Sequence, residues 1–262
     1  MNIPFYKCNS NGNDFIIILH SNNLNYNIFD KEMIRNICKY ESDLSVDGFI
    51  LLNNINLLYL MNYYNNDGSW ETFCLNGLIC CALILNKEYN KSFFEIISND
   101  VKYKTEIIKN NFVKVQMNKP IYREKNIKID NYSADYLDSG AKHLVINYKD
   151  NWEEYKKIEQ KMRAIRYNKI FEPEGINVNL YKVIDSKSIH VKTYEKGIES
   201  IMDSCASGSF ACAYDYSNKN KHIHKINVIN DGGNSQVIFE NKYSKNFFSS
   251  KGFIEFKGEL KI

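Results

Sequence analysis

The 262-residue chain contains one short pattern twice, first as CLNGLICCA at residues 74–82 and again as CASGSFACA at residues 205–213. In both copies cysteine comes first, an amide or hydroxyl residue stands two positions on, glycine three on, and Cys-Ala at the end. Because the copies lie half a chain length apart, they indicate a duplicated fold. We therefore expect two similar halves that place two thiols, Cys74 and Cys205, symmetrically about one site.

The residues after each leading cysteine favour a helix start. Asn, Ser and Gly are capping and turn residues, and good helix formers follow them, so helices are predicted to begin just after Cys74 and Cys205. A thiol at a helix N-terminus lies near unpaired backbone N–H groups, which lower its pKa and can also hold a carboxylate. Two such thiols can invert an amino acid without a cofactor, one removing the α-proton while the other delivers a proton from the opposite side.

Composition narrows the class of protein. A hydrophobic content of 44% excludes general disorder, and no apolar run approaches the ~18 residues that span a membrane. The first residues lack a signal-peptide layout. The net charge of +3 comes from scattered lysines without a basic stripe, so no nucleic-acid partner is expected. Seven cysteines, two of them adjacent, make a poor disulfide framework and favour a cytoplasmic location.

Strand-like runs outnumber helical ones, which predicts an α+β fold. Apolar residues recur at helical spacing in residues 32–40 and 152–165. Pro120 stands near the midpoint and is expected to mark the crossing between two domains. The short β-branched or aromatic runs that we expect to be strands are residues 15–19, 49–52, 57–64, 93–98, 101–108, 112–117, 143–148, 178–184, 189–194, 226–229 and 236–240.

Plainer interpretations of the cysteines remain open at this point. A buried cysteine is commonly a small hydrophobic core residue, and that role is expected of residues 38, 80, 81 and 212. Pattern alone leaves the same role open for Cys74 and Cys205. A zinc site is not expected, because cysteines 74, 80 and 81 lack CxxC spacing and have no histidine nearby.

Further segments, in order along the chain, carry a family resemblance. They are GNDF (12–15), LSVDG (44–48), NNDGS (65–69), GAKH (140–143), PEGINVN (173–179), YEKG (194–197) and DGG (231–233). With the two cysteine motifs, they resemble the diaminopimelate epimerase family of cofactor-independent two-cysteine racemases over nearly the whole chain. The resemblance implies two pseudo-symmetric α+β domains, each a β-barrel-like sheet around a central helix. Their expected bounds are 1–119, to which a strand at 251–262 returns, and 120–250.

The resemblance also implies a site. Cys74 and Cys205 would be the catalytic pair, tuned by His143 and Glu195. Neither a metal nor a cofactor is expected. The partner would be an amino-acid substrate, and a homodimer is left open. For a single asparagine a turn role stays open, and for His143 the role of a satisfied core histidine. The residues that would bind substrate are Asn13, Asn65, Leu75, Asn76, Asn177, Glu195, Lys196, Ala206 and Ser207; positions 75–76 and 206–207 would hold the α-carboxylate through backbone N–H groups.

Some positions depart from the family pattern. Leu75 puts a bulky side chain where the family has glycine. Ala141 lacks the amide of the family's asparagine, and Lys196 replaces an arginine whose fork grips a carboxylate with two hydrogen bonds. Residues 201–202 are Ile-Met in place of Glu-Thr. The two cysteines of the reaction are thus kept, while the residues that would bind the far end of diaminopimelate are altered.

The function we favour is racemisation or epimerisation without pyridoxal phosphate, with LL- to meso-diaminopimelate, in lysine and peptidoglycan synthesis, as the foremost reaction. Three alternatives differ in class. The first is a sibling racemase of another amino acid, to which Ala141 and Lys196 point. The second is an isomerase of the same fold that works without thiols, which the presence of both cysteines disfavours. The third is a catalytically inactive binding or scaffold paralogue, which only Leu75 and the loss of the threonine-like residues support.

Overall fold

The computed structural model describes residues 2–21, 29–39 and 45–261. It divides into two compact units, unit 1 with Met1–Gln116 and Ser249–Ile262, and unit 2 with Met117–Phe248. The chain passes between the units within two strands, β8 (Phe112–Met117) and β17 (Lys245–Lys251). The division thus falls inside extended strands, a few residues before the positions 119 and 250 that the sequence suggested.

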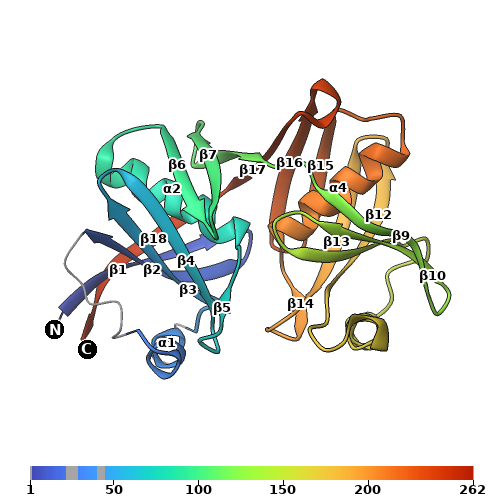
Figure 1. Cartoon of the computed structure of the whole chain (residues 1–262), viewed down its shortest axis with the longest axis horizontal. Helices are drawn as coiled ribbons and strands as arrows, with labels where there is room; N and C mark the ends of the chain where they lie inside the picture. Colours follow the sequence, from blue (N-terminus) through green and yellow to red (C-terminus); the bar gives the residue numbers. More distant parts are fainter. Residues whose placement is uncertain (1, 22–28, 40–44, 262) are drawn as a thin grey trace. The chain divides into compact units, whose positions relative to one another are not determined.

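Unit 1 is a sheet curled around helix α2 (Leu75–Tyr89), which packs against β1, β2, β4, β6, β7 and β18 (Figure 1). Every residue of α2 from Leu75 to Leu85 is buried, as expected of a helix enclosed on all sides. The strands of this unit, besides part of β8 and β17, are β1 (Asn2–Ser10), β2 (Asn13–Ser21), β3 (Gly48–Ile55), β4 (Leu58–Asn65), β5 (Trp70–Glu71), β6 (Phe93–Ser98), β7 (Val101–Ile107) and β18 (Phe253–Lys261).

A second helix, α1 (Lys31–Cys38), covers the outer face of this sheet. Its buried residues Ile34 and Ile37 join a core cluster that includes Phe49 and Leu51 of β3. Ile50, between these two, points the other way, toward α2, because successive strand residues face opposite sides of a sheet. The sheet therefore separates an inner core around α2 from an outer core under α1.

Unit 2 has the same plan around helix α4 (Ala206–Lys219), with helix α3 (Tyr155–Arg166) in the place of α1. Helix α4 packs against β10, β11, β12, β13 and β15. The strands of unit 2, besides part of β17, are β9 (Ile121–Ile129), β10 (Tyr132–Asp138), β11 (Lys142–Asn147), β12 (Asn177–Asp185), β13 (Ser188–Glu195), β14 (Ser200–Met202), β15 (Lys225–Asn230) and β16 (Gly233–Glu240). Short 3-10 turns lie at Lys169–Phe171 and Asn241–Tyr243.

Strand pairing shows the duplication directly. Strands β2 and β3 pair in parallel across α1, as β11 and β12 do across α3. Strand β4 is antiparallel to β3 and parallel to β6 across α2; β13 stands in the same way to β12 and β15 across α4. The predicted fold class, two pseudo-symmetric α+β domains with a central helix each, is confirmed.

The strands expected from the sequence are all present, with small shifts at their ends. The sequence did not predict β1, β5, β9, β10, β14 or most of β17. Strand β9 shows why: most of its residues are exposed, so its sequence carries no apolar alternation. The predicted helix at 152–165 begins later, at Tyr155. Trp152 instead stacks on Tyr148 and donates a hydrogen bond from Nε1 to His190 Nδ1 at 2.9 Å.

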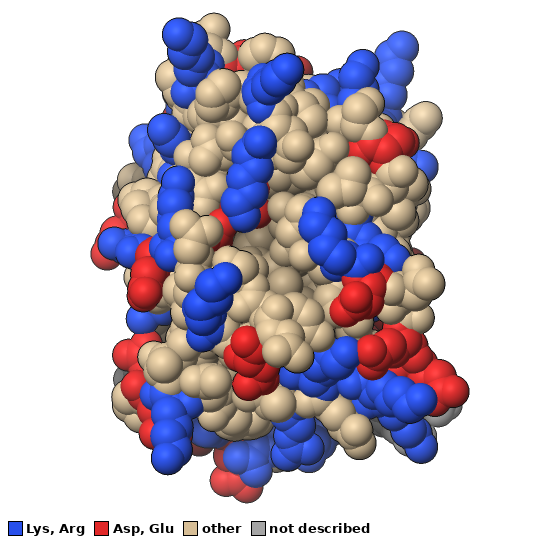
Figure 2. All heavy atoms as spheres, turned by 90° about the vertical axis from the view of Figure 1, so that its right-hand side faces the viewer, with Lys and Arg blue, Asp and Glu red and all other residues tan. Residues whose placement is uncertain are grey.

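The surface carries both signs of charge. On the face drawn in Figure 2, Lys and Arg side chains are scattered widely, and Asp and Glu lie among them. Ion pairs such as Lys142–Glu174 and Lys161–Glu153 occur on unit 2. Within the described ranges, none of the helices has the length and apolar character needed to cross a membrane.

Candidate active site

Cys74 and Cys205 occupy the same position in the two units, the N-cap of the central helix. Cys74 precedes α2 with φ −132° and ψ 109°, and Cys205 precedes α4 with φ −121° and ψ 107°. The Gly77 N–H donates to the Cys74 sulfur at 3.4 Å. The Cys205 side chain makes no such cap hydrogen bond, but the nearby Gly208 N–H lowers the pKa of its thiol. Helices thus begin directly after both cysteines, as the capping pattern predicts, and their N–H groups favour negative charge there.

The glycine three residues after each cysteine is required by packing. A Cβ atom on Gly77 would lie 2.5 Å from Ile50 Cδ1, and one on Gly208 would lie 2.1 Å from Asn179 Oδ1. Both distances are far below van der Waals contact, so a larger residue at either position would force the side chain of Ile50 or of Asn179 to move. The constraint is stronger at Gly208, because Asn179 is buried and its Oδ1 accepts a hydrogen bond from Thr193.

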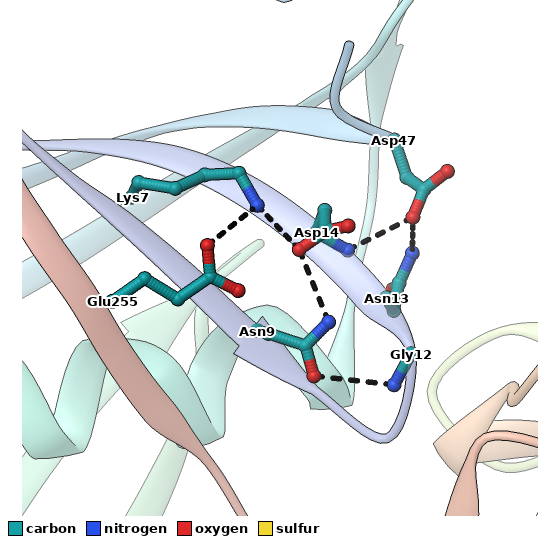
Figure 3. Close-up of polar contacts among 7 residues, drawn as sticks. All are labelled: Lys7, Asn9, Gly12, Asn13, Asp14, Asp47 and Glu255. Carbon is teal, nitrogen blue, oxygen red and sulfur yellow. Dashed lines mark hydrogen bonds and ion pairs between the residues drawn. The ribbon is translucent and has the colours of Figure 1, made fainter. Parts of the chain in front are cut away.

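Asn13, on β2, faces Cys74 with the oxygen of its amide. Its Oδ1 lies 4.0 Å from the Cys74 sulfur. Asp47 Oδ2 accepts from Asn13 Nδ2 and from the Asp14 N–H, both at 2.8 Å (Figure 3). Because an ionised carboxylate only accepts hydrogen bonds, it must face the amide NH₂, which turns Asn13 Oδ1 toward the thiol. Burial raises the pKa of Asp47, and these two hydrogen bonds oppose the rise.

A second layer of polar contacts supports this turn of the chain (Figure 3). Asn9 Nδ2 donates to Asp14 Oδ1 at 3.0 Å, and the Gly12 N–H donates to Asn9 Oδ1 at 3.2 Å. Lys7 is buried between the carboxylates of Asp14 and Glu255. The network joins β1, β18 and the turn into β2, so the backbone that carries Asn13 is held on both sides.

The other predicted residues of unit 1 are buried near the start of α2 or in the turn that leads to it. Asn65 accepts from the Tyr63 hydroxyl at 3.0 Å and donates to Ser69 Oγ at 3.2 Å, so its amide closes the turn after β4. Leu75 and Asn76, in the first turn of α2, are both almost fully buried. The bulky side chain of Leu75 is thus packed in the interior of unit 1 and does not project into solvent.

Cys205 is surrounded by groups with opposite effects on its ionisation. Burial raises the pKa of its thiol well above the usual range, and the negative charge of Glu195 raises it further. The Ser207 hydroxyl and the Gly208 N–H, both near the sulfur, lower this pKa. Glu195 and Ser207, predicted to belong to the site, are therefore both close to this sulfur, Ser207 with its Oγ at 3.6 Å.

His143, on β11, is fully buried beside the start of α4. Its Nε2 lies 3.0 Å from Ser207 Oγ, and its Nδ1 lies 3.1 Å from Asn179 Nδ2. The Ser139 hydroxyl donates to the Ser207 carbonyl oxygen at 2.9 Å and fastens the same turn of α4 to the end of β10. Burial lowers the pKa of His143 to about 4, so its ring is neutral at pH 7.

Asn177 ties two of the predicted segments together. Its Nδ2 donates to the Lys142 carbonyl at 2.9 Å, and its Oδ1 accepts from the Lys196 N–H at 2.8 Å. Ala141 lies in the turn just before Lys142, where its carbonyl accepts from the Ser139 N–H at 3.1 Å. Asn177 thus uses both ends of its amide to hold backbone, and its role toward a substrate stays a prediction. Ala206, the first residue of α4, is buried.

Four residues of this site were not predicted from the sequence: Asp47, Ser139, Asn179 and Thr193. Asp47 and Asn179 lie within the family segments, but their partners come from strands far away in the chain, so no local pattern marks them. Thr193 is marked only by its place opposite Asn179 in the β12–β13 register. Over the described parts of the chain, no group of three His, Cys, Asp or Glu side chains is placed to hold a metal ion.

The buried state of His143 predicts a pH dependence of stability. The unfolded chain binds a proton on this ring below about pH 6.5, and the folded protein binds it only near pH 4. The contribution of His143 to the free energy of unfolding is therefore complete above pH 6.5. It is lost as the pH falls from 6.5 to 4, by about 3 kcal/mol for a pKa shift of this size. Urea unfolding at several pH values should show this slope in the wild type. His143→Gln should lack it; equal slopes in both proteins would contradict the neutral, buried ring.

Comparison with known proteins gives a consistent result. The diaminopimelate epimerase of Flavobacterium psychrophilum is 33% identical over 99% of this chain and 100% of its own length. That of Hydrogenobaculum sp. is 30% identical over 92% of this chain and 99% of its own. A phenazine biosynthesis protein of the PhzF family from Enterococcus faecalis has the same fold, with a TM-score of 0.74, 12% identity and full coverage of both chains. No family model matches the chain.

Proposed function

This chain belongs to the diaminopimelate epimerase family, which makes it an isomerase, and we propose that it interconverts LL- and meso-diaminopimelate with Cys74 and Cys205 as its acid–base pair. The observation that carries the proposal is the equivalence of the two thiols. Each is the N-cap residue of the central helix of its unit, with the same extended backbone conformation, and the Cys74 sulfur accepts a hydrogen bond from the Gly77 N–H.

The proposed reaction uses one thiolate and one thiol. The thiolate removes the α-proton, and the other thiol delivers its own proton to the opposite face of the same carbon, which inverts the centre. The negative charge that develops spreads onto the α-carboxylate, which the N–H groups at the helix starts stabilise. Both thiols cannot ionise together at short range, because like charges disfavour each other, so the pair works with a single negative charge.

The surroundings of each thiol suit this division. The locked Asn13 oxygen can accept a hydrogen bond from the Cys74 S–H. At Cys205, the Glu195 carboxylate forms a hydrogen bond with the thiol and can take up its proton when the thiolate forms. The hydroxyl of Ser207 and the N–H of Gly208 then stabilise the charge on the sulfur. Each unit thus provides a polar partner for its own sulfur.

Isotope exchange tests the proposed function. The protein is incubated in heavy water with LL-diaminopimelate and, separately, with a panel of other amino acids. We expect deuterium at the α-carbon of diaminopimelate together with the meso product, detected by mass spectrometry and chiral chromatography. A double variant, Cys74→Ala with Cys205→Ala, serves as the control. Absence of exchange with every amino acid tested, by a folded protein, would refute the racemase assignment.

Oxidation provides a second test of the pairing. Two sulfurs that act on one carbon come close enough to be joined, so mild oxidant should inactivate the enzyme and link the peptides of Cys74 and Cys205. A reductant should restore activity. Peptide mapping of the oxidised protein identifies the link, and the Cys74→Ser variant should not form it. Full activity after oxidation, in a protein whose two thiols have not reacted, would count against the pair.

A further inference from the structure

A chain of buried polar groups leads from strand β13 to the Cys205 sulfur. Thr193 Oγ1 is 2.8 Å from Asn179 Oδ1, and Asn179 Nδ2 is 3.1 Å from His143 Nδ1. His143 Nε2 is 3.0 Å from Ser207 Oγ, which lies 3.6 Å from the Cys205 sulfur. All four groups between the strand and the sulfur are buried, with His143 and Asn179 fully so. The direction of each hydrogen bond in this chain follows from the groups around Asn179.

The amide of Asn179 can be oriented in only one way. Its Nδ2 lies 3.0 Å from the Leu144 carbonyl oxygen and 3.3 Å from the Asn177 carbonyl oxygen. Carbonyl oxygens only accept, so the NH₂ must face them and Oδ1 must face the hydroxyl of Thr193. The NH₂ is then also the group that faces His143. The backbone of β11 and β12 thereby sets the side chain between these strands.

This orientation decides where the proton of His143 resides. An NH₂ group offers only hydrogens, so the Nδ1 atom that faces it must be the unprotonated nitrogen of the ring. A neutral ring with unprotonated Nδ1 carries its hydrogen on Nε2, and burial keeps the ring neutral. The Nε2–H therefore donates to Ser207 Oγ. Because Ser207 Oγ accepts this hydrogen bond, its own hydrogen is free to point at another acceptor, and the Cys205 sulfur lies 3.6 Å away.

We propose that Asn179 acts as a positioning residue, which fixes the tautomer of His143 and so aims the hydroxyl hydrogen of Ser207 at the Cys205 sulfur. The hydroxyl is thus set as a donor to the thiolate before the thiolate forms. The inference rests on the proposed function in one respect, that Cys205 has to ionise during the reaction. It assigns His143 the task of orienting a neighbour rather than that of a proton carrier.

Other groups act on the same sulfur and must be kept constant in the test. Glu195 on β13 faces the thiol and opposes its ionisation, and Cys212, further along α4, is close enough to interact with it. Asp138, at the end of β10, acts on His143. The Ser207 hydroxyl lowers the pKa of the Cys205 thiol, whereas burial and the charge of Glu195 raise it. Removal of the hydroxyl should therefore raise this pKa while the other groups stay in place.

The test measures ionisation of Cys205 without substrate, so that it stands apart from the racemase assignment. Iodoacetamide reacts with thiolates, and mass spectrometry of peptides gives the rate at Cys205 as a function of pH. For Ser207→Ala we expect alkylation of Cys205 to be about tenfold slower at a given pH, which corresponds to a rise of about one unit in the pKa of the thiol. Ser207→Thr keeps the hydroxyl and should restore the wild-type rate.

Ser209→Ala is the matched control. Ser209 lies in the same turn of α4, is equally buried, and its hydroxyl donates to Asn230 at 3.0 Å, away from the sulfur. Its loss should lower stability without changing the rate of Cys205 alkylation. An unchanged rate in Ser207→Ala, or the same slowing in Ser209→Ala, would overturn the proposal.

The tautomer can be observed directly. Long-range ¹⁵N–¹H spectra of protein labelled in histidine should show His143 as the neutral Nε2–H form down to about pH 5, with the resonance assigned by its loss in His143→Gln. Asn179→Leu removes the NH₂ and should produce a mixture of tautomers. If that variant does not fold, the wild-type spectrum still decides, because an Nδ1–H tautomer would refute the arrangement.

Discussion

Replacement of either Cys74 or Cys205 by serine is expected to reduce epimerisation of diaminopimelate on the order of 10³-fold or more, since each thiol transfers a proton in the proposed reaction. A serine hydroxyl keeps the size of the side chain but ionises far above neutral pH, so it can neither remove nor deliver the proton efficiently. Chiral chromatography of product formed from pure LL-diaminopimelate measures the effect. Near-wild-type turnover by either variant would refute the two-base mechanism.

The two variants should differ in a second measurement. Each keeps one working thiol, so each can still exchange the α-proton of the stereoisomer that presents its hydrogen to that thiol. Deuterium uptake from heavy water, scored separately for the two isomers, should therefore be one-sided and opposite in the two proteins. Cys212→Ser, on the same helix as Cys205 and buried in the core, is the control and should exchange both isomers. Two variants with the same isomer preference would contradict opposed attack.

The second large effect concerns substrate range. Diaminopimelate carries a second ammonium and carboxylate, and a site that lacks partners for them discriminates against it. Ala141 offers no amide, and Lys196 replaces a forked donor with a point charge. We expect Ala141→Asn combined with Lys196→Arg to raise kcat/KM for diaminopimelate by about one to two decades, which corresponds to charge-assisted hydrogen bonds of roughly 1.5–3 kcal/mol.

The structure supports the choice of these two positions as a pair. Asn177 fastens the backbone beside Ala141, at Lys142, and the backbone of Lys196 itself. The two substitutions therefore lie on segments that one amide holds together. Lys187→Arg, an exposed position in the β12–β13 turn, is the control for a general effect of arginine. A wild-type protein that uses diaminopimelate alone, and gains nothing from the double substitution, would refute altered specificity.

Much of the architecture could be predicted from the sequence because it depends on local signals. The repeated cysteine motif marks two helix starts, and capping chemistry acts within a few residues. Most strands were found because their β-branched and aromatic runs are bounded by turn residues. Strand β9 was missed because its exposed residues carry no such contrast, and Trp152 was placed on a helix because its spacing fits one although its ring packs against Tyr148.

The sequence by itself determined the duplication, the α+β class, the two thiols at helix N-termini and the residues that resemble a family. Only the tertiary structure decided the hydrogen-bond directions around the thiols. Asp47 turns the oxygen of Asn13 toward Cys74, and two strand carbonyls turn the NH₂ of Asn179 toward His143. Asp47 lies 34 residues from Asn13, and Leu144 lies 35 residues from Asn179. They meet only through strand pairing, and a sequence does not show which end of an amide faces a neighbour until the acceptors around it are in place.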